Sequence, residues 1–279
     1  MIGYDAASEA PTLAEYYGTV IDQIVECMAE GTYCALLGPH LSGKTHVLRH
    51  IDRSLARSLG WTCVYIDLYA IKAFTQQGFF AELMSLVAAR VAELTSELLA
   101  VPEARLASSA EFRGFLKDAV SALGRDIVLI IEHLEALPTD LVQALLTSLR
   151  AAYMDQQTLD RRVLVVVSGA LSLATLTVGE SSPFRGIARR IFVGDLTRDE
   201  SERLNAEQLQ DARVEATHRA SRRLLRATSG DPYLIRTISQ RCIEAVDSQA
   251  SRCLRGRTVR AATREFLRSR VYDYGPLQE

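Results

Sequence analysis

The sequence predicts an α/β fold in which a parallel five-stranded sheet with flanking helices precedes an all-helical C-terminal region. Two observations lead to this prediction. Over the first two-thirds of the 279 residues, short apolar runs alternate with longer helical patterns, which is typical of parallel sheets with crossover helices. After Asp195 only helical periodicity remains. We therefore expect an α/β core over residues 1–195 and a helical region over residues 196–279.

The first half of the core is predicted to contain two strands. Residues 33–37 (YCALL) and 62–68 (TCVYIDL) are mainly apolar runs of strand length. Between them, residues 44–59 repeat apolar side chains at spacings of three and four, which indicates a helix with one buried face. Two further amphipathic helices are expected near residues 79–99 and 112–123.

The second half of the core is predicted to contain three strands. Residues 127–131 (IVLII) are apolar throughout, as expected for a strand that is covered on both faces. Residues 138–154 form a helical pattern with a proline in the opening turn, where its missing N–H leaves no hydrogen bond unmade. The fourth and fifth strands are predicted at residues 163–168 and 190–193.

The C-terminal region is predicted to be helical only, and it is basic. Thr197 opens its first helix and Glu200 lies three residues later, the spacing of a capping box. Between residues 213 and 270 there are fourteen Arg against five Asp plus Glu, although the whole chain has a formal net charge of −2. The expected helices cover residues 197–209, 214–228, 232–246 and 259–271.

The composition is that of an ordinary globular protein. Hydrophobic residues make up 48% of the chain and charged residues 24%, which argues against a disordered or fibrous protein. The longest apolar runs are far shorter than the roughly 20 residues that span a bilayer. The first residues do not form a secretory signal, and the five cysteines form no CxxC pair. We therefore expect a cytoplasmic protein without a disulfide framework.

One motif carries clear chemistry. Between the first strand and the following helix, the sequence fits G-x-x-x-x-G-K-[ST], the phosphate loop called Walker A. Its backbone N–H groups and the helix N-terminus would bind phosphate oxygens, Lys44 would reach the β- and γ-phosphates, and the Thr45 hydroxyl would ligate Mg²⁺. A tight turn with an incidental lysine is the alternative. The expected ligand is ATP or ADP with Mg²⁺, bound by Gly38, Pro39, His40, Leu41, Ser42, Gly43, Lys44, Thr45 and His46.

The third strand ends in the second element expected of an ATPase. Such enzymes place an acid that holds Mg²⁺ at this point, followed by a glutamate that activates water. Here Glu132 stands where Asp is usual, and His133 stands where the catalytic Glu is expected. Glu135 could contribute if the strand end turns inward; otherwise His133 and Glu135 are solvated residues at a helix start. Because imidazole is a poor substitute for a carboxylate here, we expect slow or absent ATP hydrolysis.

The fourth strand ends in Ser168, followed by glycine. This strand should lie beside the first, so the hydroxyl of Ser168 could contact the γ-phosphate or position a water molecule. A simple Ser-Gly turn is the alternative.

Several segments, in order, resemble the bacterial AAA-like ATPases of the STAND class (signal-transduction ATPases with numerous domains). Residues 31–38 (GTYCALLG) and 64–71 (VYIDLYAI) are similar to GEFCYVLG and VVIDLTAI of that family. Residues 182–187 (SPFRGI) and 229–234 (SGDPYL) resemble its SPFNVG and GGHPYL. The resemblance covers about residues 15–240 and implies a P-loop NTPase fold of the ASCE/AAA-like type, with the helical region as a lid.

The resemblance also implies site residues outside the core motifs. Gly230 and Pro232 fill the G-x-P positions that bring the lid against the nucleotide in such proteins. Without the family resemblance, both residues would be explained by a glycine that ends one helix and a proline that starts the next. Tyr16 and Tyr17 precede the first helix, where the family contacts adenine. The family's acidic pair is replaced here by Glu132 and His133, which puts catalysis in doubt but leaves binding intact.

These observations favour a nucleotide-controlled switch, in which ATP or ADP bound between core and lid couples to self-association or to a protein partner in signalling. The alternative is a DNA-associated AAA+ ATPase, such as a loader or a transposition or replication helper. It would use helical arginines of the lid to meet phosphates. A scaffold with a vestigial phosphate loop would conflict with the placement of Lys44, one of only three lysines in the chain. The arginines in question are Arg219, Arg222, Arg223 and Arg226.

Overall fold

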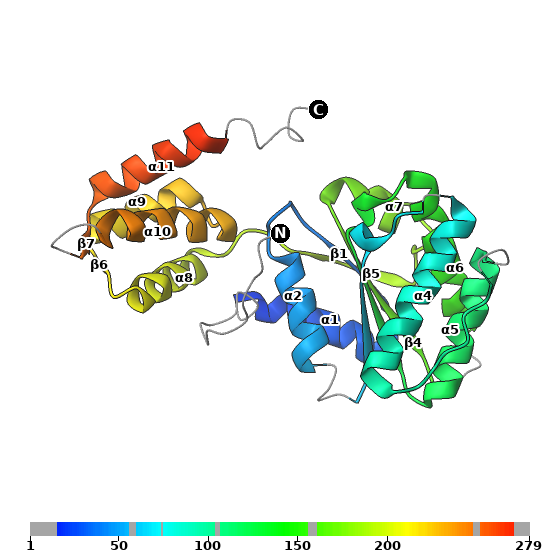
Figure 1. Cartoon of the computed structure of the whole chain (residues 1–279). Coiled ribbons are helices and arrows are strands. Elements are labelled where there is room, and N and C mark those ends of the chain that lie inside the picture. Colours follow the sequence, from blue (N-terminus) through cyan, green and yellow to red (C-terminus); the bar gives the residue numbers. More distant parts are fainter. Residues whose placement is uncertain are drawn as a thin grey trace. The chain divides into compact units, whose positions relative to one another are not determined.

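The computed structural model describes residues 16–55, 60–73, 75–103, 107–155, 161–247 and 252–270 (Figure 1). It divides into two compact units, which are described separately. Among the described residues, the first unit contains residues 16–40 and 44–193, and the second contains residues 194–270 together with residues 41–43.

The first unit is built on a five-stranded sheet, and every strand pair in it is parallel. The strand order is β2-β3-β4-β1-β5, so β4 lies between β3 and β1. The predicted parallel five-stranded sheet is therefore confirmed. The strands are β1 (Tyr33–Leu37), β2 (Thr62–Asp67), β3 (Ile127–Glu132), β4 (Val163–Gly169) and β5 (Ala188–Phe192).

Helices flank this sheet on both sides, with α1 and α2 on one side and α4, α5 and α6 on the other (Figure 1). The helix predicted from Lys44 is present, but after His50 its backbone changes from an α-helix to a π-helical turn, η2 (Ile51–Leu55). The predicted residues 56–59 lie outside the described residues. The other elements are α1 (Gly18–Glu30), α2 (Lys44–His50), η3 (Leu68–Ala70), α4 (Gln76–Thr95), α5 (Ser109–Leu123), η5 (Leu134–Ala136), α6 (Thr139–Asp155), η7 (Leu171–Leu173) and α7 (Ala174–Val178).

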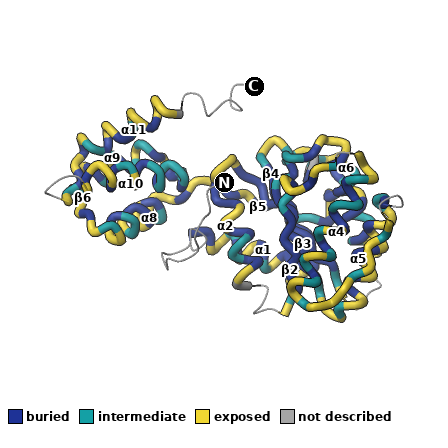
Figure 2. The backbone as a smooth tube through the Cα atoms, in the orientation of Figure 1, coloured by how far each residue is buried: buried dark blue, intermediate teal, exposed yellow. Residues whose placement is uncertain are grey.

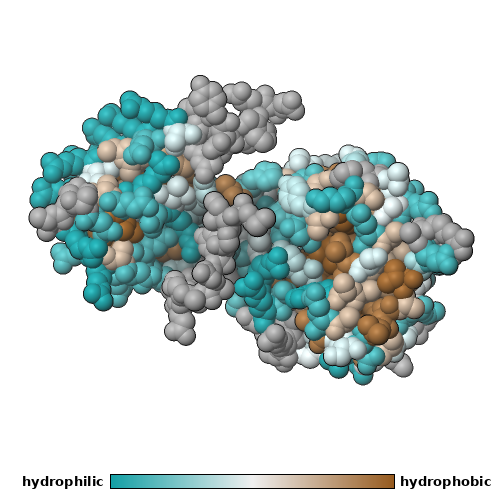
Figure 3. Space-filling view, viewed as in Figure 1, coloured by the Kyte–Doolittle hydropathy of each residue, from teal (hydrophilic) through white to brown (hydrophobic). Residues whose placement is uncertain are grey.

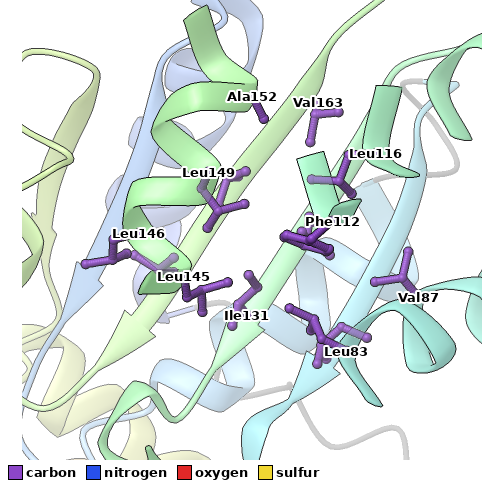
Figure 4. Packing of buried hydrophobic residues seen from close by; sticks show 14 of the residues in the cluster. Leu83, Val87, Phe112, Leu116, Ile131, Leu145, Leu146, Leu149, Ala152 and Val163 are labelled. Atoms are coloured by element: carbon purple, nitrogen blue, oxygen red, sulfur yellow. The ribbon is translucent and has the colours of Figure 1, made fainter. Parts of the chain in front are cut away.

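A hydrophobic core lies between the sheet and helices α4, α5 and α6 (Figure 4). Alternate residues of β3 face this layer, because successive side chains of a strand point to opposite faces. Each large apolar side chain buried here contributes about 1.5–3 kcal/mol to folding. The side chains of this layer include Leu83 and Val87 of α4, Phe112 and Leu116 of α5, Leu145 and Leu149 of α6, and Ile131 and Val163 of the sheet.

The central strands are buried along their whole length, as Figure 2 shows. All six residues of β3 and all seven of β4 are buried, which is the pattern of parallel strands covered on both faces. The edge strand β5 differs, since only Ile191 in it is buried. This rigid centre holds the ends of β3, β4 and β1 at one edge of the sheet.

The second unit consists mainly of helices α8 (Arg198–Asp211), α9 (His218–Thr228), α10 (Pro232–Asp247) and α11 (Gly256–Arg270). The capping box at the start of α8 is confirmed, because Thr197 and Glu200 exchange both hydrogen bonds. The predicted helical C-terminal region is also confirmed, with one addition that the sequence did not predict. Two-residue strands, β6 (Glu215–Ala216) and β7 (Cys253–Leu254), pair in parallel. Strands this short show no periodicity in a sequence.

All five cysteines are free thiols. Cys27, Cys34, Cys63 and Cys242 are buried, and Cys253 is half-buried. Within the described ranges, no helix is both long and apolar enough to cross a membrane.

Candidate nucleotide-binding site

The candidate site lies at the carboxyl ends of three adjacent strands. The register pairs Leu36 of β1 with Ser168 of β4, and Ile131 of β3 with Val167 of β4. The phosphate loop after β1, Ser168 and the residues after β3 therefore meet at one edge of the sheet. This edge is where open α/β sheets bind their ligands.

The phosphate loop runs from the end of β1 to the start of α2 at Lys44. Two of its residues have left-handed backbone conformations, Leu41 with φ of 64° and Gly43 with φ of 96°. Such reversals can turn successive N–H groups toward a common point and form an anion-binding concavity. The side chains of Pro39, His40 and Leu41 are exposed on this loop.

Lys44 is held against its own loop. Its ammonium donates to the carbonyl oxygens of Gly38 (2.9 Å) and Pro39 (2.6 Å), and the residue is only 8% exposed. Burial lowers the pKa of Lys44 from its usual value, and the carboxylates of Glu135 and Glu132 oppose this shift. A buried cation satisfied only by neutral carbonyls gains strongly from a nearby anion.

Thr45 and Glu132 form the second part of the site. The Thr45 hydroxyl donates to Glu132 Oε1 at 2.6 Å, and the phenol of Tyr65 donates to Oε2 of the same carboxylate. Glu132 is 1% exposed, so its carboxylate is fixed between these two donors. The Arg49 guanidinium lies 3.6 Å from the centre of the Tyr65 ring. A hydroxyl beside a carboxylate is a set of hard oxygen donors, which fits Mg²⁺.

His133 is also held in place. It has a left-handed conformation (φ 63°, ψ 51°) at the turn from β3 into η5. Its Nδ1 lies 2.9 Å from Asp67 Oδ1, its Nε2 lies 4.0 Å from Glu132 Oε1, and its ring packs against Tyr69. His133 is thus more than a solvated residue at a helix start.

Sequence reasoning missed Asp67 as a member of this site. Asp67 ends β2 and also accepts a hydrogen bond from the Tyr69 backbone N–H at the start of η3. In the sheet register Asp67 lies opposite Glu132, which places it beside His133. The sequence did contain a signal for Asp67, because Asp67 and Glu132 are both acidic residues at the end of an apolar strand. The sequence did not show that these strands are neighbours.

Glu135 and Ser168 lie at the end of β4. Glu135 Oε2 accepts from the Ala170 N–H at 3.3 Å, so Glu135 does turn toward the sheet edge. Ser168 is fully buried, and its Oγ has no hydrogen-bond partner among the described residues. An orphaned buried hydroxyl costs about 1–3 kcal/mol. A bound ligand or water at this edge would remove that cost.

Gly230 and Pro232 lie in the second unit, with Gly230 in the turn between α9 and α10 and Pro232 as the first residue of α10. Gly230 has a φ of 94°, and its carbonyl accepts from the Leu196 N–H at 2.8 Å. Asp231 caps α10 by accepting from the Leu234 N–H at 2.9 Å, and burial raises the pKa of this carboxyl. The local structure alone thus requires a glycine at this turn.

Comparison with protein families identifies one match. The family described as AAA ATPase domain matches residues 19–167, which include the phosphate loop, Glu132 and His133. No curated protein matches the chain.

Similar solved structures share the fold over nearly the whole chain. The Walker-type ATPase PABY2304 of Pyrococcus abyssi has a TM-score of 0.64 and 18% identity, covering 92% of this chain and 76% of that one. Cdc6p from Pyrobaculum aerophilum has a TM-score of 0.64 and 15% identity, with coverages of 95% and 69%. The Aeropyrum pernix ORC1 protein in complex with DNA has a TM-score of 0.61 and 16% identity, with coverages of 96% and 70%.

Proposed function

Because the chain belongs to the AAA ATPase domain family, we propose that it binds ATP or ADP with Mg²⁺ at the carboxyl ends of strands β1, β4 and β3. One observation carries this proposal. Lys44 holds a buried ammonium against the phosphate loop, and the next residue, Thr45, donates its hydroxyl to the buried carboxylate of Glu132. These are the groups that phosphate oxygens and a hard divalent cation require.

Each residue has a defined task in this proposal. Lys44 exchanges the carbonyls of Gly38 and Pro39 for phosphate oxygens, and the N–H groups of the loop bind the remaining oxygens. Thr45 and Glu132 hold Mg²⁺, which when bound neutralises charge on the phosphates. Ser168 gains a partner in the ligand or in a water beside it. Pro39, His40, Leu41, Ser42, Gly43 and His46 complete the nucleotide-binding segment, as the sequence predicted.

The role of Glu132 gives a specific expectation. In Glu132→Gln the affinity for ATP in the presence of Mg²⁺ falls about 10-fold, because a weaker oxygen donor replaces the carboxylate. The affinity measured without Mg²⁺ changes little. Isothermal titration with Mg-ATP, and again with ATP in EDTA, measures the affinity with and without Mg²⁺. Equal losses under both conditions would show that Glu132 acts in some other way.

We propose that hydrolysis is slow, because His133 occupies the place of the usual glutamate. The Nδ1 of His133 is engaged with Asp67, and an imidazole lacks the negative charge with which a carboxylate orients and polarises the attacking water beside metal and phosphate. Glu135 lies at the end of β4, where its Oε2 accepts from the Ala170 N–H.

Turnover of ATP tests this proposal. We expect wild-type turnover far below the typical enzyme rate of about 10 per second, and a rise of about 10-fold or more in His133→Glu. A phosphate-release assay measures both rates, while the ATP affinity of the variant serves as the control. Wild-type turnover near the typical rate, or no gain in His133→Glu, would contradict the assignment.

We further propose that the chain is a STAND-type switch, in which the nucleotide state controls self-association or binding of a protein partner in signalling. The segments that resemble STAND ATPases support this reading. The available energy is the difference in affinity of two protein states for the nucleotide. The decisive measurement is which nucleotide co-purifies, combined with the mass in solution with ADP and with an ATP analogue. An identical mass, with and without candidate partners, would contradict the switch.

A second candidate function is a DNA-associated ATPase. It is supported by the similarity to the ORC1 protein that was solved in complex with DNA. This function requires a surface on the chain that binds DNA.

A further inference from the structure

The second unit carries an arginine strip on α9, formed by Arg219, Arg222, Arg223 and Arg226. These positions are spaced by three and four residues, so they share one face of the helix. α9 contains no Asp or Glu, and its opposite face is buried. The buried residues of α9 are Ala220, Leu224 and Thr228.

The charge of the arginine strip is not neutralised within the unit. No carboxylate of the described residues forms an ion pair with it, and Arg223 donates instead to the Gly256 carbonyl at 3.0 Å. Four other arginines of the unit do form ion pairs with carboxylates. They pair as Arg198–Glu202 (2.9 Å), Arg203–Glu207 (3.7 Å), Arg241–Glu265 (3.8 Å) and Arg252–Asp247 (2.6 Å).

The arginine strip lines two hollows on the surface of the second unit. With His218 and Ala227 it lines a hollow of about 700 Å³. Arg222 and Arg226 also line a second hollow, of about 330 Å³, together with Arg198. The face of the unit seen in Figure 3 is largely hydrophilic. Concave surface of a single charge sign concentrates the field and favours extended polyanions.

The start of α11 extends this basic surface. At Gly256 a Cβ atom would lie 3.6 Å from Arg219 Cγ and 3.5 Å from Arg223 Nη1, so α11 begins directly against the strip. Arg255 and Arg257 flank Gly256, and both are exposed. Five exposed arginines, three of them on α9 and two beside Gly256, therefore belong to segments that meet at this point.

We propose that the arginine strip binds the phosphate backbone of duplex DNA. Guanidinium groups match phosphate oxygens with two parallel hydrogen bonds, and a duplex presents phosphates as a dense, regular array. The strip includes no aromatic residue, so it offers no stacking of bases, and the contacts proposed are to phosphates, which carry no sequence information. Binding is therefore independent of sequence and strongly dependent on salt. The inference names the surface that the second candidate function needs, and it rests on that function for the class of partner.

Fluorescence anisotropy of a labelled 30-base-pair duplex of mixed sequence, titrated with the whole chain at 50–200 mM salt, tests the proposal. We expect binding that weakens with salt, with a log–log slope near −3 for about three to four neutralised phosphates. The triple variant R219Q/R222Q/R226Q lowers the affinity at 100 mM salt by about 30-fold and reduces the slope by about 3 units.

The matched control is R113Q/R203Q/R252Q, which removes the same charge from exposed arginines that pair with carboxylates. It should change the affinity less than about 3-fold. Melting temperatures confirm that both triple variants are folded. Lys44→Ala should keep its DNA affinity, so a failure of nucleotide binding remains distinguishable from a failure of DNA binding.

Four results would overturn the proposal. The first is no binding at 50 mM salt, and the second is an equal loss of affinity in the two triple variants. The third is that polyglutamate displaces the labelled duplex as effectively as unlabelled duplex does at the same concentration of negative charge, which would identify an acidic protein as the partner. The fourth is tighter binding of duplex RNA than of duplex DNA.

Discussion

Replacing Lys44 with alanine is expected to lower the affinity for Mg-ATP by at least about 100-fold. The ammonium would make charge-assisted hydrogen bonds to phosphate oxygens, and two such bonds contribute about 3 kcal/mol or more, which corresponds to this factor. No other lysine side chain lies on the phosphate loop, since Lys72 and Lys117 belong to other segments. Isothermal titration of Mg-ATP measures the loss.

The control for this variant is Lys117→Ala, because Lys117 is exposed on α5. It should leave the affinity unchanged. Lys44→Ala should not lower the melting temperature of the free protein, because it removes a buried charge whose burial is already costly. The rise in melting temperature that ATP causes in the wild type should disappear. Unchanged ATP affinity in Lys44→Ala would end the proposal of a nucleotide-binding loop.

Replacing Gly230 with alanine is expected to destabilise the second unit by about 3 kcal/mol or more. The new Cβ would lie 2.5 Å from the Leu196 carbonyl oxygen, and the backbone φ of 94° is unfavourable for any side chain. The Leu196 N–H bonds the Gly230 carbonyl, so the clash also strains this hydrogen bond. Hydrogen exchange of α8 and α10 amides reports the loss within this unit.

Gly186→Ala is the matched control for the clash. Gly186 also has a left-handed backbone, with φ of 79°, but a Cβ atom there would meet nothing within 4 Å. This variant should lose only about 1 kcal/mol, from backbone strain alone. If Gly230→Ala lost no more stability than Gly186→Ala, the inferred clash between a Cβ atom at position 230 and the Leu196 carbonyl would be contradicted. A loss of nucleotide binding without loss of stability would favour the ligand contact that the family resemblance implies.

Much of the fold could be predicted from the sequence because its central strands are apolar at every position. Buried parallel strands need such runs, and the helices between them repeat apolar residues at spacings of three and four. The five strands accordingly lie within two residues of their predicted bounds at each end. The phosphate loop was equally readable, since its chemistry requires specific residues at fixed spacing.

Other features had no local signal. The two-residue strands β6 and β7 are too short to show a period, and they form only because residues far apart in the chain meet. The end of β2 at Asp67 came one residue earlier than predicted, because the Asp67 side chain caps the turn η3. The contact of Asp67 with His133 likewise depends on the pairing of β2 with β3.

The sequence by itself determined the five strands of the main sheet, most of the helices, the phosphate loop and the identity of the residues at the end of each strand. These follow from the stereochemistry of short chain segments, which each segment carries with it. The tertiary structure alone decided the strand order, and hence that Glu132 meets Thr45 and Tyr65, that His133 meets Asp67, and that Ser168 lies between the loop and β3. It also decided which arginines find carboxylates and which do not. Such contacts join residues distant in the chain, so they depend on how the whole core packs.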